Sequence, residues 1–342
     1  MALRWMDGFD YLKTGEQARR YDSYSWVNNL VTGRDGLGKA IQPSNSTYLY
    51  KSISGNQTTL IAGMSAYFTG TGTTYPFFCF TDDQGIPNKP VLQLEFWGGG
   101  GPSQPNILVY ANGAQIGQTT TSPISFGSWH WLEFKCTIDP VNGMWEVRVD
   151  ESVVGGGIGV NTSTTGNPWA NGFLLSNANQ DNNFYDDLVI LDSIGPAPYN
   201  TYLGDCRIET LYPAGVGSHT DFTSSNSNPN WQNVAEIPSD YDSSYVSSAT
   251  IGAMDTYPPS APTSSGTNVA VQVVATARKA DVGSRQIAVV LRTQGVDVTG
   301  STVSDAASDY LCYFDIFTHD GLGNIWLLPT ITAGEFGFTV VS

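Results

Sequence analysis

Residues 128–150 read SWHWLEFKCTIDPVNGMWEVRVD, two runs of alternating apolar and polar residues joined by a Pro-Val-Asn-Gly turn. In the second run, Trp145, Val147 and Val149 share one face and the charged residues share the other. This period of two is typical of a half-buried antiparallel strand. Asn142-Gly143 ends the turn, at a place where a left-handed conformation costs Gly little. The stretch therefore predicts a β-hairpin.

Strand-like stretches continue on both sides of this hairpin, at 60–68, 75–83, 91–98, 106–113, 173–177 and 184–192. About eight strands with regular turns favour a sandwich or jelly roll. Residues 193–205 break the pattern with two prolines, and strand-like stretches return at 268–280, 285–295, 309–317 and 336–342. We therefore predict an all-β chain, with a jelly-roll sandwich over residues 1–195 and a second β-sandwich-like domain over residues 196–342.

The composition supports strands and narrows the range of partners. Only 13% of the 342 residues are charged, against about 25% in an average soluble domain, so long helices with charged outer faces are not expected. The net charge of −16 disfavours contact with nucleic acid or an anionic membrane surface. No apolar run is long enough to predict membrane insertion. The first residues lack a basic region followed by an apolar run, so no conventional signal peptide is expected.

The four cysteines are widely spaced and form no Cys-x-x-Cys pair. Cys79 and Cys136 lie inside apolar strand patterns, and Cys206 and Cys312 lie in the second half of the chain. Without an export signal, we expect structural thiols rather than disulfides or metal ligands.

The hairpin and the stretch FYDDLVILD (184–192) together resemble a known class of β domain. They are similar to the central hairpin and closing strand of concanavalin A-like lectin/glucanase jelly rolls, including laminin-G-like modules. The resemblance covers roughly residues 1–195 and implies that fold. It implies no particular function, because lectins, enzymes and passive modules share it.

A second resemblance spans nearly the whole chain and rests on the order of several short motifs. These are MALRWMDGFDYL (1–12), FYDDLVILD, LGDCRIETLYPAG (203–215), WQNVAE (231–236), DSSYVSS (242–248) and GEFGFTVVS (334–342). In this order they resemble tailed-bacteriophage virion proteins of the minor tail, tail fibre or general structural type. The resemblance implies a non-enzymatic virion component that is assembled in the host cytoplasm, contacts other virion proteins and has no cofactor.

The same resemblance implies a homo-oligomer. Trimers are common among fibre and spike proteins, although the sequence fixes no number. The C-terminal domain is interpreted as the multimerisation element, because its last strand-like stretch, 336–342, carries no polar tail. A capsid decoration protein or capsid fibre is the alternative location, and contact with host surface polysaccharide is compatible with either. A carbohydrate-active enzyme or a free lectin is the alternative from another class.

The sequence gives little support for catalytic residues. Retaining β-glucanases of the jelly-roll class carry carboxylates at alternating positions of a strand, and the nearest match here is Glu146-Val-Arg148-Val-Asp150-Glu151. Arg148 at the central position opposes the use of a neighbouring carboxyl as an acid, so we expect a solvated polar face and no catalytic residue. The three histidines, His130, His219 and His319, are too dispersed to indicate a metal site or a triad.

The sequence has two glycine runs, 98–101 and 155–157. Neither is a phosphate-binding loop, because the Lys and Ser/Thr that complete such a loop do not follow. They are interpreted as flexible loops or bulges at the rim of the jelly roll. No nucleotide cofactor is therefore expected.

Two binding hypotheses concern acidic and aromatic residues. Asp181, Asp186 and Asp187 supply oxygen atoms of the kind that calcium prefers, although neighbouring strand residues point to opposite faces. In the alternative interpretation, one of the pair caps a turn or bonds buried backbone. Trp97 and Trp169 are candidates for contact with a sugar, although tryptophans in sandwiches also fill cores.

Overall fold

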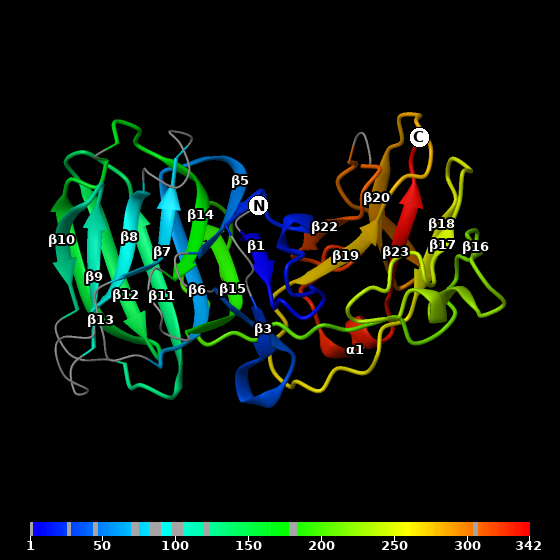
Figure 1. The fold of residues 1–342 in the computed structure, drawn as a ribbon, viewed down its shortest axis with the longest axis horizontal. Helices are drawn as coiled ribbons and strands as arrows, with labels where there is room; N and C mark the ends of the chain where they lie inside the picture. The colour runs from blue at the N-terminus through cyan, green and yellow to red at the C-terminus, as the bar shows by residue number, and fades with distance from the viewer. Residues whose placement is uncertain are drawn as a thin grey trace. The chain divides into compact units, whose positions relative to one another are not determined.

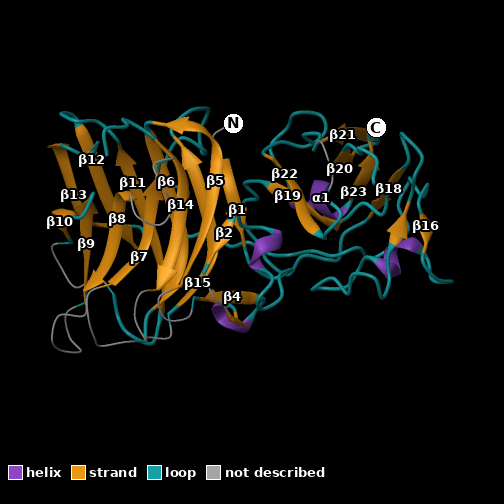
Figure 2. Cartoon of the chain, turned by 45° about the horizontal axis from the view of Figure 1, so that its top comes forward, coloured by secondary structure: helices purple, strands orange, loops and turns teal. Residues whose placement is uncertain are grey.

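The computed structural model of the chain divides into two compact units (Figure 1). Unit 1 comprises Met1–Phe9 and Lys13–Ile208, and unit 2 comprises Asp10–Leu12 and Glu209–Ser342. The structure describes residues 3–25, 29–43, 47–69, 75–82, 90–97, 105–119, 124–163, 165–177, 183–303 and 307–342. Strands make up most of its regular structure, and the helices in these ranges are short (Figure 2).

Unit 1 consists of two antiparallel sheets. Its strands are β1 (Leu3–Asp7), β2 (Ser23–Tyr24), β3 (Asn29–Thr32), β4 (Lys39–Gln42), β5 (Thr47–Gln57), β6 (Thr59–Tyr67), β7 (Tyr75–Thr81), β8 (Pro90–Trp97), β9 (Asn106–Ala111), β10 (Ala114–Gln118), β11 (Trp129–Thr137), β12 (Gly143–Val149), β13 (Ser152–Val160), β14 (Ala170–Asn177) and β15 (Phe184–Asp192). The eight-stranded sheet has the order β13-β12-β11-β6-β15-β4-β3, with β1 paired to β15. The seven-stranded sheet has the order β10-β9-β8-β7-β14-β5-β2.

The core of unit 1 lies between the two sheets. Phe134 of the eight-stranded sheet stacks on Phe80 of the seven-stranded sheet, with ring centroids 5.9 Å apart. Nearby, Phe68 stacks on Phe96 at 4.5 Å. All four rings are buried, so aromatic contacts join the sheets face to face. The predicted all-β, concanavalin A-like jelly-roll sandwich is confirmed.

The hairpin of residues 128–150 forms β11 and β12, with Cys136 opposite Trp145 and Glu133 opposite Arg148. Trp145, Val147 and Val149 are buried on the inner face. The predicted inner face of the second strand is therefore confirmed.

The second glycine run has a packing role. Residues 155–157 lie within β13, which pairs with β12. A Cβ atom at Gly157 or at Gly117 of β10 would overlap the Trp145 indole. The run is therefore strand rather than flexible loop, and these glycines make room for a large side chain. The alternative interpretation as a bulge agrees with the register shift at Gly155. The first run, 98–101, lies outside the described residues.

Unit 2 is smaller and also built from antiparallel strands. Its elements are β16 (Thr223–Ser224), η3 (Asn230–Asn233), β17 (Val246–Ser247), β18 (Met254–Tyr257), β19 (Val271–Ala277), β20 (Ile287–Thr293), β21 (Val296–Thr299), β22 (Leu311–Phe317), α1 (Leu328–Thr332) and β23 (Glu335–Val340). A four-stranded sheet has the order β18-β23-β20-β21, and β19 pairs with β22. Leu291, Trp326 and Ile331 form a buried cluster, against which Val271 and Phe317 pack.

The region before β18 has little regular structure and is fixed by a buried carboxylate. Asp255 accepts hydrogen bonds from the backbone N–H of Phe222 (2.8 Å), the side-chain amide of Asn230 (2.6 Å) and the hydroxyl of Tyr257 (2.7 Å). One charged group therefore holds a loop, a 3-10 turn and a strand together.

The last strand, β23, is an inner strand of the four-stranded sheet. β23 pairs with β18 along one edge and with β20 along the other. Neither edge of this strand is therefore open to another chain, and the multimerisation role of the C-terminal domain stays a prediction.

Deletion of residues 336–342 is expected to unfold unit 2 and to leave unit 1 folded. The deletion removes a central strand, so β18 and β20 lose their shared partner. Backbone NMR of the truncated chain checks this: resonances of unit 1 should keep their positions while those of unit 2 collapse to random-coil values. Native resonances for β18 and β20 in the truncated chain would contradict the pairing.

Candidate functional site

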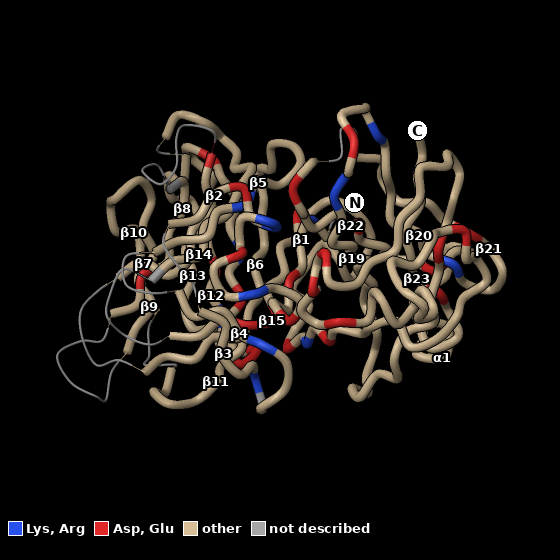
Figure 3. The backbone as a smooth tube through the Cα atoms, turned by 45° about the vertical axis from the view of Figure 1, so that its right-hand side comes forward, with Lys and Arg blue, Asp and Glu red and all other residues tan. Residues whose placement is uncertain are grey.

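The outer face of the β11–β12 hairpin carries a charged ladder. Glu133 and Lys135 of β11 lie opposite Arg148 and Glu146 of β12, respectively. The Arg148 Nε donates a hydrogen bond to Glu146 Oε1 at 2.7 Å. Glu146 and Arg148 of this ladder belong to the glucanase-like pattern at residues 146–151. Asp and Glu residues occur along both units (Figure 3), so an acidic face alone does not indicate chemistry.

The ladder is covered by residues 202–208, a segment that we call the strap. The Tyr202 ring lies over Arg148, with the guanidinium carbon 3.8 Å from the ring centroid. The backbone N–H of Gly204 donates to Glu133 Oε1 at 3.0 Å, and that of Asp205 donates to Glu151 Oε1 at 3.3 Å. The prediction of a solvated polar face is therefore only partly right, because backbone N–H groups of the strap, rather than water, bind the carboxylates of Glu133 and Glu151.

Burial of Trp131 supports this arrangement. Trp131 and Glu133 lie on the same outer face of β11, by strand alternation, yet their exposed fractions are 1% and 3%. An outer-face side chain is buried this completely only when another segment covers it. A Cβ atom at Gly63 of the adjacent β6 would meet the Trp131 ring at 2.8 Å, so this glycine allows the indole to lie flat on the sheet.

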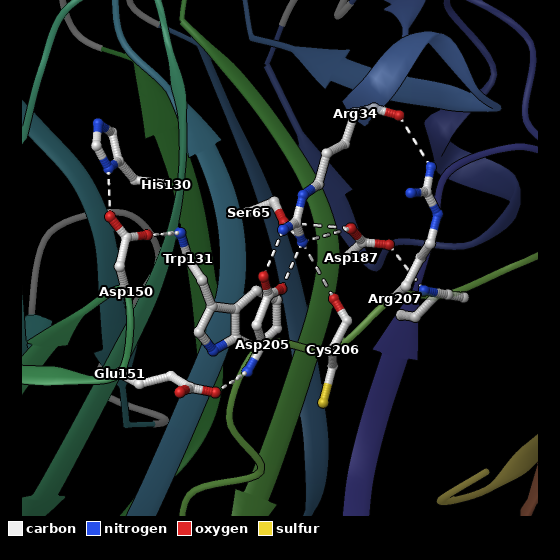
Figure 4. A network of polar contacts seen from close by, with 11 residues as sticks. Arg34, Ser65, His130, Trp131, Asp150, Glu151, Asp187, Asp205, Cys206 and Arg207 are labelled. Carbon is white, nitrogen blue, oxygen red and sulfur yellow. Dashed lines mark hydrogen bonds and ion pairs between the residues drawn. The ribbon is translucent and has the colours of Figure 1, made fainter. Parts of the chain in front are cut away.

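Arg34 fastens the strap to the sheet (Figure 4). Its Nη1 and Nη2 atoms donate to the two carboxylate oxygens of Asp205 at 2.6 and 2.5 Å. Nη1 also donates to Ser65 Oγ at 3.0 Å and lies 3.8 Å from Asp187 Oδ2. The backbone carbonyl of Arg34 accepts a hydrogen bond from Arg207 at 2.9 Å. Bidentate pairing of this kind is strong and geometrically specific.

The paired aspartates of β15 both contact this anchor. Asp186 Oδ2 accepts the backbone N–H of Arg34 at 2.9 Å, and Asp187 Oδ1 accepts the backbone N–H of Ile208 at 2.7 Å. Asp187 has a φ of 54°, and the pairing of β15 with β6 is irregular between Asp186 and Val189. The expectation that the two side chains point to opposite faces is wrong, because this bulge interrupts the alternation.

The calcium hypothesis remains a prediction. Asp181 lies outside the described residues, and Asp186 and Asp187 bind backbone N–H groups. Among the residues that the structure describes, no group of three or more His, Cys, Asp or Glu side chains is placed to hold a metal ion.

Two carboxyls beneath the strap have raised pKa values. Burial raises the pKa of Glu133, although the Gly204 N–H and the charge of Arg148 oppose this effect. Burial likewise raises the pKa of Asp187, opposed by the Ile208 N–H and by Arg34. In each case the unfolded chain ionises at a lower pH than the folded chain. The contribution to stability is therefore lost as pH rises from the unfolded-state value through the folded-state value.

Glu133→Gln is expected to stabilise the protein more at pH 7.5 than at pH 4.5. Glutamine keeps an oxygen that can accept the Gly204 N–H but carries no charge to desolvate. The unfolding midpoint in urea, measured for both proteins at both pH values, checks this. The same difference at both pH values would contradict it.

Glu335→Gln in unit 2 is the control with the opposite sign. Burial opposes ionisation there as well, but hydrogen bonds from Ser218 and Thr256 outweigh it and hold the pKa of Glu335 below its usual range. Loss of this carboxylate should therefore cost more at pH 7.5 than at pH 4.5.

The two tryptophans proposed as sugar contacts lie at opposite ends of the seven-stranded sheet. Trp97 ends β8 and pairs with Asn106 of β9, at an exposed fraction of 40%. Trp169 is half-buried and precedes β14, which begins at the other end of the neighbouring β7. The two side chains therefore do not form one site.

Trp97 has polar neighbours on the outer face of this sheet. Gln93 and Glu95 alternate with buried residues of β8 and are half-buried. Gln93 donates a hydrogen bond to Glu95 and lies opposite Tyr110 of β9. Burial raises the pKa of Glu95. This outer face therefore combines aromatic rings with hydrogen-bonding groups.

The histidines have short-range polar partners that the sequence did not reveal. His130 lies between Ser125 and Asp150, at 2.9 and 2.8 Å from their side-chain oxygens. His219 bonds Asp297 at 3.0 Å, and His319 bonds Thr318. The position of His130 on a strand is as expected, but its two partners were missed. The hairpin pattern places Asp150 beside the start of β11. It was the one sequence feature that indicated a contact between Asp150 and His130.

The cysteines are free thiols, as predicted. Burial raises the pKa of Cys79 and of Cys136 to about 12, so both remain protonated at neutral pH. No helix in the described part of the chain has the length and apolarity needed to cross a membrane.

Comparisons with known proteins add little to this geometry. Neither protein-family models nor curated protein sequences match the chain. Solved structures that resemble it include alginate lyase Aly36B, with 11% identity, a TM-score of 0.39 and coverage of 56% of this chain and 95% of that one. A carbohydrate esterase from Shiga toxin-encoding bacteriophage phi24B has 14% identity, a TM-score of 0.37 and coverages of 50% and 89%.

Lectin UEA-II, solved with galactose, has 10% identity, a TM-score of 0.32 and coverages of 55% and 98%. At these values the likeness carries no argument about function.

Proposed function

We propose that the protein is a non-enzymatic structural component of a tailed-phage virion, located on the tail or a fibre and acting as a homo-oligomer. The motif LGDCRIET, which carries much of the sequence resemblance, forms the strap and its continuation. Asp205, Arg207 and Ile208 bind the sheet of unit 1. Glu209 accepts hydrogen bonds from Thr263 and Ser264 within unit 2. The residues of this motif therefore make structural contacts within each unit.

The observation that carries this proposal is the engagement of the hairpin's carboxylates by the protein itself. A retaining glycosidase needs two carboxyls about 5–5.5 Å apart with access to a sugar. Glu133 and Glu151 instead accept N–H groups of the strap, and Glu146 is bonded to Arg148. This supports a structural role, rather than that of a retaining glycosidase, for the outer face of the hairpin.

Location on the particle tests the proposal. Antibodies against the purified chain, applied to intact phage and viewed by electron microscopy, should label the tail or its fibres. Label on the capsid shell would move the protein to a decoration or capsid-fibre role. Virions that contain no copy of the chain by mass spectrometry would overturn the proposal.

Contact with host surface polysaccharide is a second function, favoured by the outer face of the seven-stranded sheet. Trp97 is the exposed aromatic residue beside Gln93 and Glu95 on this face. Affinity electrophoresis in gels that contain host polysaccharide should show retardation that Trp97→Ala abolishes. Trp169→Ala, at the other end of the sheet, is the matched control. Equal retardation of the wild type and the Trp97 variant would exclude this face as the contact.

A further inference from the structure

We propose that Ser125, His130 and Asp150 form a serine-hydrolase triad that cleaves accessible acyl esters. The Oγ of Ser125 lies 2.9 Å from His130 Nε2, and His130 Nδ1 lies 2.8 Å from Asp150 Oδ2. The other carboxylate oxygen of Asp150 accepts the backbone N–H of Trp131 at 3.0 Å. Nucleophile, base and orienting carboxylate thus follow one another within hydrogen-bond distance. This activity goes beyond the proposed virion role: it leaves the location on the particle unchanged and replaces only the non-enzymatic part of that proposal.

The hairpin register holds the base and the carboxylate together. His130 lies near the start of β11, and Asp150 directly follows β12 on the adjacent strand. The backbone N–H of Asp150 donates to the carbonyl of Trp131 at 2.8 Å. Asp150 has a φ of 48°, a conformation in which its chain turns at the end of the strand. Figure 4 shows its carboxylate between the His130 ring and the Trp131 backbone.

The nucleophile is on a turn that the sandwich fixes. Ser125 precedes β11 and is exposed, whereas the His130 side chain is only 12% exposed. The backbone N–H of Gly127 donates to the carbonyl of Phe68 at 2.9 Å, and Phe126 packs edge-to-face on Phe96. The base is therefore held in place while the hydroxyl remains accessible to a substrate from solvent.

The Asp150 contact favours the tautomer that a general base requires, whereas the Ser125 carbonyl oxygen, 3.3 Å from Nε2, favours a hydrogen on Nε2. A carboxylate only accepts hydrogen bonds, so the Nδ1 atom that faces Asp150 carries the hydrogen. Nε2 then presents its lone pair to Ser125. The backbone N–H of Ser125 also lies 3.0 Å from Nε2, and it competes with the hydroxyl for this lone pair. We therefore expect a slow hydrolase whose activity is most visible with activated esters.

The reaction has two balanced steps. The Ser125 Oγ attacks the ester carbonyl carbon while its proton passes to His130 Nε2. Collapse of the tetrahedral intermediate breaks the bond to the alcohol oxygen, which leaves with that proton. Water then attacks the acyl-serine, gives a proton to the same nitrogen, and releases the carboxylic acid as the proton returns to Ser125. No co-reactant other than water is needed.

The exposed position of Ser125 defines the substrate class. A nucleophile on a rim turn suits a small acyl group, such as acetyl, displayed on a polymer or in solution. An alcohol leaves more easily than an amine, so esters rather than amides are the expected substrates.

Covalent labelling tests the nucleophile directly. A fluorophosphonate probe reacts with an activated serine, which displaces fluoride from phosphorus. We expect mass spectrometry of the wild-type chain to locate the adduct on Ser125, and Ser125→Ala to abolish it. Ser128, exposed in the same turn, supplies the matched control, and Ser128→Ala should label like the wild type. No adduct on Ser125 under conditions that label a known serine esterase would overturn the proposal.

Hydrolysis of p-nitrophenyl acetate tests the base and the carboxylate. We expect Ser125→Ala and His130→Gln each to lower the enzyme-dependent rate by about 100-fold, the scale of one positioned general base. Asp150→Asn, which tolerates a positive φ, should lower kcat and leave KM nearly unchanged. Ser125→Ala with the wild-type rate would mean that His130 only fixes the turn, and the triad would be rejected. Both tests use the purified chain, so their failure leaves the virion role untouched.

Discussion

Replacement of Arg34 by methionine is expected to lower the free energy of unfolding of unit 1 by about 1–3 kcal/mol, the scale for losing hydrogen bonds to charged groups, because the Asp205 side chain is 45% exposed. Methionine keeps the aliphatic stem but removes every guanidinium contact to Asp205, Ser65 and Asp187. Asp187 is buried, and its carboxylate then lies in a low-dielectric site without its counter-charge. Urea denaturation followed by tryptophan fluorescence measures the loss.

Arg34→Lys separates charge from geometry at this anchor. Lysine keeps the positive charge but cannot pair with both Asp205 oxygens in a planar fork. We expect this variant to recover only part of the loss. Full wild-type stability in Arg34→Met would contradict the role of Arg34 as the anchor of the strap.

Replacement of Trp145 by alanine is expected to cost about 3–5 kcal/mol, the usual range for deletion of a buried aromatic side chain. The indole is 3% exposed and fills the space that Gly117 and Gly157 leave open. Trp129→Ala is the control, because Trp129 is half-buried and contacts Tyr67 edge-to-face. Thermal and urea unfolding of both variants should show a clearly smaller loss for Trp129→Ala.

Substitution of a glycine that faces Trp145 provides a second test of this packing. Gly117→Ala should destabilise the wild type by about 1–3 kcal/mol, because its Cβ would overlap the indole. In the Trp145→Ala background the same change should cost little, since the space is empty. Additive effects in the double variant would show that the two positions do not share one cavity.

The sequence predicts the hairpin and most long strands because apolar alternation is a local signal. It fails at β13, where four glycines weaken the strand pattern. The reason for these glycines is Trp145 on another strand, and such a contact is not visible in a local window. The same limit applies to β23, whose central place depends on pairing with β18 and β20.

The site is less predictable because its parts come from distant segments. The strap motif was visible, but Arg34, Glu133 and Asp187 are far apart in sequence and meet only through the sheet. Alternation failed at Asp186-Asp187, where a bulge with a positive φ turns both carboxylates toward Arg34. Ser125 was missed because a turn, rather than a strand pattern, places it beside His130.

Amide hydrogen exchange in the strap tests most directly whether the strap is bound to the outer face of the hairpin. The N–H groups of Gly204, Asp205 and Ile208 each donate to a carboxylate of unit 1. In the purified wild-type chain, NMR-detected exchange should show the Gly204 and Ile208 amides, which bind the buried Glu133 and Asp187, protected by at least about tenfold, the factor of a local opening energy near 1.4 kcal/mol. Exchange of both amides at the rate of an unstructured peptide would mean that the strap does not occupy these carboxylates, and the structural interpretation of the hairpin would fail.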